Sequence, residues 1–153
     1  MEYGTIEREM FIDAAPEIVF DVVSSPEHVA VWWSDDADYP PEPGPGGWIA
    51  FRGPGEDVQK VRFMVAEAVP HSRFAFRWTH AEGDDAAPGN SNLVVFDLEP
   101  LGTGTMVRLT ESGFRERGWD EAKARETHAD HTTGWDRYLP QLVAYAERLG
   151  ARS

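Results

Sequence analysis

The chain has 153 residues, with 27 acidic against 14 basic side chains, no cysteine and a formal net charge of −13. A chain of this length predicts one domain, over residues 1–153, with a core large enough to fold without metal or disulfide. The lack of cysteine excludes disulfides, thiolate catalysis and zinc–thiolate sites. The excess of negative charge disfavours binding to nucleic acid or to anionic lipid.

Hydropathy and the N-terminal composition bear on location. No apolar run approaches the roughly 20 residues of a membrane span, so no membrane insertion is expected. The first residues are acidic and alternate like a strand, which is unlike a signal peptide. We therefore expect a cytoplasmic protein.

The first third of the chain predicts one strand and two short helices. Residues 5–13 alternate apolar and polar side chains, as a half-buried strand does. Pro16 and Pro26 each suit the first position of a helix, which predicts helices over 13–25 and 25–34. Residues 35–47 hold four prolines and three glycines, which predicts a loop rich in turns.

The middle of the chain predicts five short strands, each bounded by Gly, Pro, Asn or Asp. They cover residues 47–53, 57–69, 73–80, 92–100 and 104–114. The third of these is the clearest, because Phe74, Phe76 and Trp78 share one face while Arg73 and Arg77 share the other.

A long helix is expected over residues 121–149, with Asp120 as its cap and Gly150 as its stop. At 1.5 Å per residue it would be about 43 Å long. The order of elements is that of an α+β protein. About six antiparallel strands would twist too strongly to stay flat, so we expect a curved sheet wrapped around this helix, with a cavity between them.

Four segments in sequence resemble the Hsp90 ATPase activator homologue proteins of the START/Bet v 1-like superfamily, also called SRPBCC proteins. They are the opening segment at residues 6–33, the segment from Glu67 through Pro70 to Trp78, the Gly-Thr turn and strand ending in Gly-Phe at 104–114, and the Gly-Trp helix at 134–149. The resemblance implies a helix-grip fold with two short helices after the first strand. Relatives bind lipids, hormones or polyketides, catalyse aromatic cyclisation, or stimulate a chaperone, so the fold alone does not fix the function.

The C-terminal helix carries one apolar stripe whose character changes along its length. After Leu139 the stripe is apolar, which predicts packed core, whereas before Trp135 it includes His128 and His131. Buried imidazoles need polar partners, which a cavity with water or a ligand can supply. We expect ligand-binding walls from Trp33, Phe63, Trp78, Glu111, His128, His131 and Trp135.

Three functions stay open, and no catalytic residue is assigned. The preferred hypothesis is a protein that binds a small hydrophobic molecule. The second is a cyclase- or lyase-like enzyme on a polyketide or aromatic ligand, in which Glu111 with His128 or His131 forms the acid–base pair. The third is a chaperone-interacting module, and a homodimer is a further option.

The histidine pair could also face solvent near the start of the helix, and a metal site is a further interpretation. His128 and His131 are three residues apart on one helix face, and Glu111 is the best candidate for a further ligand. No second motif supports this ligand set, so neither a metal nor another cofactor is expected.

Overall fold

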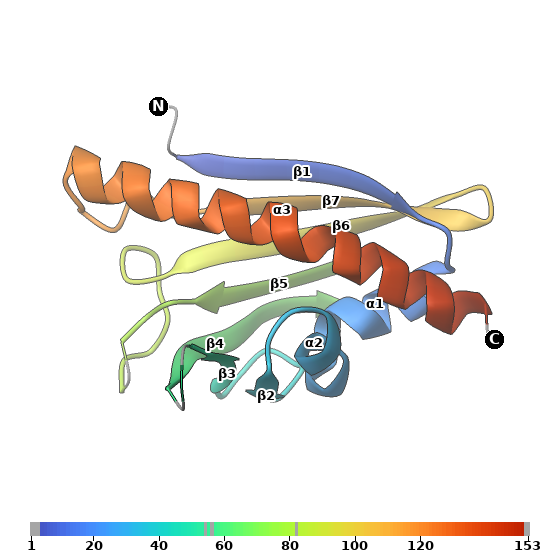
Figure 1. The fold of residues 1–153 in the computed structure, drawn as a ribbon, viewed down its shortest axis with the longest axis horizontal. Coiled ribbons are helices and arrows are strands. Elements are labelled where there is room, and N and C mark those ends of the chain that lie inside the picture. Colours follow the sequence, from blue (N-terminus) through green and yellow to red (C-terminus); the bar gives the residue numbers. More distant parts are fainter. Residues whose placement is uncertain (1–3, 54, 56, 82, 152–153) are drawn as a thin grey trace.

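The computed structural model describes residues 4–53, 55, 57–81 and 83–151. Figure 1 shows a sheet crossed on one face by a long helix. The elements in chain order are β1 (Thr5–Ile12), α1 (Pro16–Ser24), α2 (Pro26–Trp32), β2 (Asp36–Asp38), β3 (Gly47–Arg52), β4 (Val58–Val69), β5 (Arg73–Trp78), β6 (Asn92–Leu101), β7 (Gly104–Ser112) and α3 (Glu121–Ala151). This is the expected α+β helix-grip fold.

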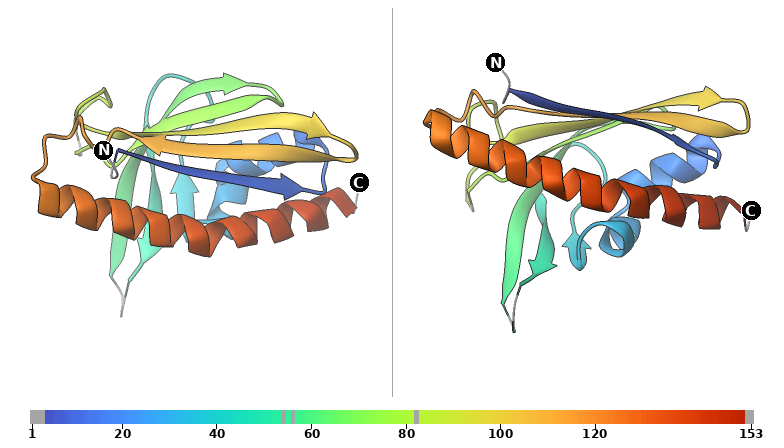
Figure 2. Two further views of the ribbon diagram at one scale, coloured as in Figure 1. Left: turned by 90° about the horizontal axis from the view of Figure 1, so that it is seen from above. Right: turned by 45° about the horizontal axis from the view of Figure 1, so that its top comes forward.

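The sheet is antiparallel throughout, with the strand order β1-β7-β6-β5-β4-β3-β2. The first strand of the chain, β1, therefore pairs with the last, β7, and Ile6 lies opposite Glu111. Figure 2 shows that the sheet is curved, with β3 and β4 bending toward the side on which α3 lies. A register shift between Val65 and Glu67 marks an irregularity in β4, where extra twist is expected.

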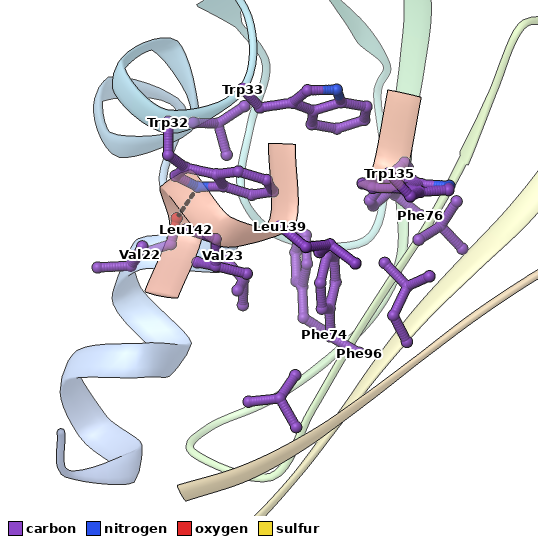
Figure 3. Close-up of a cluster of buried hydrophobic side chains, with 14 of the residues drawn as sticks. Val22, Val23, Trp32, Trp33, Phe74, Phe76, Phe96, Trp135, Leu139 and Leu142 are labelled. Atoms are coloured by element: carbon purple, nitrogen blue, oxygen red, sulfur yellow. Dashed lines mark hydrogen bonds between the residues drawn. The ribbon is translucent and has the colours of Figure 1, made fainter. Parts of the chain in front are cut away.

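The core lies between the concave face of the sheet and the three helices. Strand alternation places the buried side chains, since Phe74 and Phe76 of β5 are buried while Arg73 and Arg77 are partly exposed. Six residues from β5, β6, β7 and α3 lie in this one buried cluster: Phe76, Phe96, Val107, Leu109, Leu139 and Leu142. Figure 3 shows part of this cluster, where residues of α1, α2 and α3 meet those of the sheet.

Two details differ from the sequence-based expectations. The segment at 35–47 contains β2, a strand of three residues paired with β3, so the described residues form a sheet of seven strands rather than about six. The strand was not predicted because it is short and lies next to a proline-rich loop. The final helix also continues through Gly150 to Ala151, so Gly150 does not stop it.

The start of α3 agrees with expectation, because the carboxylate of Asp120 accepts a hydrogen bond from the Lys123 backbone N–H at 2.8 Å. Helix α3 is long, but no helix among the described residues is apolar enough over a sufficient length to cross a bilayer.

Candidate functional site

A fully buried carboxylate lies at the centre of the grip. Val107, Leu109 and Glu111 alternate along β7 and all face the core, as their spacing predicts. The side chain of Glu111 is 0 % exposed. A buried carboxylate is costly unless donors surround it, so its partners decide what this site is.

Four side chains donate N–H groups to Glu111. Its Oε2 accepts from Trp78 Nε1 at 2.9 Å and from Asn92 Nδ2 at 3.0 Å, and its Oε1 accepts from Trp135 Nε1 at 2.9 Å. His131 Nδ1 lies between both oxygens, at 2.9 and 3.0 Å. Each carboxylate oxygen therefore has at least two donors, which offsets the loss of hydration.

Regular secondary structure brings these donors together. Trp78 and Asn92 are directly opposite each other in the β5–β6 pair, and Glu111 lies opposite Val94 in the next pair. His131 and Trp135 are four residues apart on α3 and so share one face of the helix. We call Trp78, Asn92, Glu111, His131 and Trp135 the Glu111 cluster.

Aromatic rings pack closely over the Glu111 cluster. The ring of Trp33 lies 5.0 Å from that of Trp135 and 5.1 Å from that of Trp78, between ring centroids. Trp33 also contacts Phe51 at 6.0 Å, and Phe51 contacts Tyr138 at 6.3 Å. Phe51 and Tyr138 are only partly buried, so the aromatic cluster reaches the surface between β3 and α3.

The adjacent tryptophans at the end of α2 differ in their hydrogen bonding. Trp32 is in the core, where its Nε1 donates to the Val22 carbonyl at 2.9 Å, as the dashed line in Figure 3 marks. The Trp33 indole follows the helix and is 7 % exposed, and its Nε1 has no hydrogen-bond acceptor among the described residues. Trp33 is thus the more adaptable of the two.

His131 joins the buried carboxylate to the surface. Its side chain is 16 % exposed, and its ring packs against Trp78 and Phe114 at centroid distances of 5.1 and 5.5 Å. Glu111 engages Nδ1, whereas the described part of the chain offers no hydrogen-bond partner to Nε2. Because a carboxylate accepts the Nδ1 proton, the neutral ring presents a lone pair at Nε2.

The other two predicted wall residues lie at the margins. His128 of α3 is half-buried beside the start of β1, with its Nε2 2.8 Å from the Thr5 carbonyl and its ring 5.2 Å from that of Phe114. Phe63 is fully buried and stacks on Phe76 at 4.2 Å, one ring away from Trp33. The described residues contain no group of three or more His, Asp or Glu side chains placed to hold a metal ion.

The predicted cavity coincides with a closely packed region. Trp33, Trp78 and Trp135 fill the space under the first half of α3 with their own rings, so the cavity itself stays a prediction. A pocket of about 240 Å³ lies instead beside the second half of α3 and β1, and its lining includes Arg8, Met10, Asp136, Leu139, Pro140 and Val143.

Sequence reasoning missed two polar residues, one within the Glu111 cluster and one beside it. Asn92 opens β6 and is fully buried, although the sequence indicated only that it begins a strand. Arg117 lies in the loop before α3, where its Nη1 donates to Asn92 Oδ1 at 3.2 Å. No local pattern identifies such contacts, because they join residues far apart in the chain.

Most of the chain, including the whole Glu111 cluster, matches a known protein family. The family model described as Activator of Hsp90 ATPase homolog 1-like protein matches residues 13–147. The chain belongs to this family. Among curated proteins, none matches this family member significantly.

Solved structures share its fold. A protein from Mesorhizobium loti is 23 % identical with a TM-score of 0.73, over 94 % of this chain and 97 % of the other. The Aha1 dimer from Colwellia psychrerythraea is 23 % identical with a TM-score of 0.68, over 94 % and 96 % of the two chains. A protein from Nitrosomonas europaea reaches a TM-score of 0.77 at 14 % identity, over 97 % of each chain. At these identities the likeness establishes the fold alone.

Proposed function

We propose that this protein binds a small hydrophobic molecule carrying one or two oxygen functions, between the curved sheet and the first half of α3. The observation that carries the proposal is the hydrogen bonding of His131. Its Nδ1 is held by the buried carboxylate of Glu111, whereas its Nε2 makes no hydrogen bond to the described residues. The proposed ligand contacts are those predicted from the sequence: Trp33, Phe63, Trp78, Glu111, His128, His131 and Trp135.

The apolar part of the ligand would displace Trp33 from the aromatic cluster. Trp33 follows the end of α2, and its indole N–H makes no hydrogen bond to the described residues that would have to break. Trp78 and Trp135, by contrast, are fixed through their N–H groups to Glu111. Rotation of Trp33 past Phe51 and Tyr138 would open a site with rigid aromatic walls, the usual lining of a small-molecule site.

The polar part of the ligand would meet His131. With its proton on Nδ1, the imidazole accepts a hydrogen bond at Nε2 from a hydroxyl group. Glu111 fixes the ring orientation, so little rotational freedom is lost when the ligand binds. The apolar surroundings strengthen this hydrogen bond by excluding water.

Tryptophan fluorescence can test this proposal with 2-naphthol and naphthalene as the probes. We expect saturable quenching by both and tighter binding of 2-naphthol. One hydrogen bond can account for a preference of up to about tenfold in Kd, and His131→Phe should abolish most of it. Trp135→Ala should weaken both probes more strongly. His71→Phe, at an exposed turn, is the matched control and should change neither.

Two outcomes would contradict the proposal. One is the absence of saturable quenching by either probe, which would favour the chaperone-interacting module. The other is a preference for 2-naphthol that His131→Phe leaves intact. Native mass spectrometry of the purified protein would identify any molecule that it retains.

A second function, proton transfer on such a ligand, is favoured by the Glu111–His131 contact of 2.9 Å. His131 Nε2 would take a proton next to a ligand carbonyl, and Glu111 would stabilise the resulting imidazolium, as a carboxylate does for a general base. Deuterium uptake by 2-tetralone in D₂O should then be faster with wild type than with His131→Phe. Equal uptake would reject the enzymatic function.

We also propose that the chain forms a homodimer, because the Aha1 protein from Colwellia psychrerythraea, which shares its fold, is a dimer. Analytical ultracentrifugation would decide this, and a monomer at all concentrations would reject it.

A further inference from the structure

The turn after β5 holds a polar group that the described residues leave unpaired. His80 follows β5 and is 8 % exposed, and its Nδ1 is a buried atom with no hydrogen-bond partner in the described part of the chain. A buried polar atom left unpaired costs about 1–3 kcal/mol, so native proteins rarely keep one without a use.

Arg117, in the loop before α3, lies against the same turn with donors to spare. Its Nη1 donates to Thr79 Oγ1 at 2.7 Å and to Asn92 Oδ1 at 3.2 Å, and its Nη2 donates to the Thr79 carbonyl at 3.1 Å. A guanidinium group has five N–H donors, so two of them have no acceptor among the described residues. The described part of the chain also places no carboxylate within ion-pair distance of it.

The backbone here is held in a rare conformation. Thr79 has φ of 68°, a left-handed value that a β-branched residue seldom adopts. Both hydrogen bonds from Arg117 to Thr79 hold this conformation, which in turn sets where His80 lies. Such strain is commonly kept where a site requires it.

The charge around His80 favours an anion over a cation. Burial lowers the pKa of His80, and Arg62 and Arg117 lower it further, against the opposing effect of Asp84 and Asp85. The imidazole is therefore neutral at neutral pH. The positive charges of Arg62 and Arg117 offset the negative charges of Asp84 and Asp85, so an oxygen anion can approach the neutral imidazole with less repulsion.

We propose that Arg117 and His80 form a carboxylate-binding site at the turn after β5. Arg117 would use its two remaining N–H groups in a bidentate contact, and His80 would donate from Nδ1. The site lies next to Trp78 but is distinct from the proposed hydrophobic site, and it does not depend on it, since a carboxylate without an apolar group should bind.

The test is an NMR titration with sodium acetate, with sodium chloride at equal ionic strength as reference. We expect saturable shifts of the His80 ring and of the Arg117 Nε–H signal with acetate only. The exposed His71 ring should not respond. Arg117→Gln should weaken acetate binding by about tenfold or more, whereas Arg115→Gln, which removes the same charge from the same loop, should change it by less than about twofold.

His80→Phe keeps an aromatic ring in place and tests the site if Arg117→Gln fails to fold. We expect it to reduce the acetate-dependent shift of the Arg117 Nε–H signal. The proposal is overturned if acetate and chloride act alike, or if Arg115→Gln weakens binding as much as Arg117→Gln. It is also overturned if the Arg117 signal responds to acetate equally with and without the His80 ring.

Discussion

At the scale of single residues, Glu111 determines the arrangement of the site. One carboxylate orients two indoles, an amide and an imidazole, which come from β5, β6 and α3. A buried charge gives specificity at a cost in desolvation, and removal of one partner is more damaging than its net contribution suggests. The Glu111 cluster therefore links the stability of the protein to the geometry of the proposed site.

Replacement of Glu111 by Gln tests this link. The amide NH₂ would face the N–H donors that now meet one carboxylate oxygen, which leaves donors unpaired inside the core. We expect a loss of roughly 3–5 kcal/mol in the free energy of unfolding, measured by urea denaturation. The control is Glu116→Gln on the exposed loop, which should change it by less than about 0.5 kcal/mol. A loss below about 1 kcal/mol for Glu111→Gln would contradict the role given to the cluster.

At the scale of the elements, helix α3 has two distinct parts. Its first half carries His131 and Trp135 toward Glu111, whereas its second half buries Leu139, Leu142 and Ala146 against the sheet and α1. The polar part requires hydrogen-bond geometry, and the apolar part requires only shape and volume. Substitutions in the two halves should therefore affect different properties.

Leu142→Ala should reduce the stability of the fold without changing the chemistry of the site. The side chain is fully buried, so its truncation should cost about 2–5 kcal/mol in denaturant unfolding. The neighbouring Gln141→Ala lies on the exposed face and serves as the control. The buried stripe would be refuted by a Leu142→Ala change smaller than about 0.5 kcal/mol.

Periodicity explains which elements could be predicted from the sequence. Alternation in β5 and β7 and the three- and four-residue steps of α3 place Trp78, Glu111 and His131 on inward faces. The three-residue β2 escapes such patterns, because its pairing with β3 depends on tertiary contacts. Whether Trp33 lines a cavity or fills it depends on its rotamer and on the side chains packed around it. These neighbours come from distant parts of the chain, so no local sequence pattern predicts the rotamer.

At the scale of the whole molecule, the net charge is −13 and several arginines are engaged in ion pairs with carboxylates. Arg8 contacts Asp136 at 2.8 Å, Arg73 contacts both Glu67 and Asp97, and Arg108 contacts Glu9. Exposed pairs of this kind add little stability, because water and salt screen the attraction between the two charges. These ion pairs matter more for binding to other molecules, because an arginine that is already paired with a carboxylate attracts a polyanion only weakly.

The protein should therefore not bind duplex DNA, RNA or vesicles rich in phosphatidylserine at physiological salt. Electrophoretic mobility shift and vesicle sedimentation would check this, with a basic nucleic-acid-binding domain as the positive control. Tight binding that weakens steeply as salt rises would contradict the small-ligand interpretation.

The pairing of β1 with β7 has a consequence for how the protein folds. The first strand can take its place in the sheet only after the last strand has been made, and the pairing of Ile6 with Glu111 closes a loop spanning most of the chain. Such distant pairing carries an entropic cost before its hydrogen bonds form, and folds of this kind are slow. During synthesis on the ribosome, β1 would stay unpaired until β7 has been made. The buried environment of Glu111 would then be among the last parts of the structure to form.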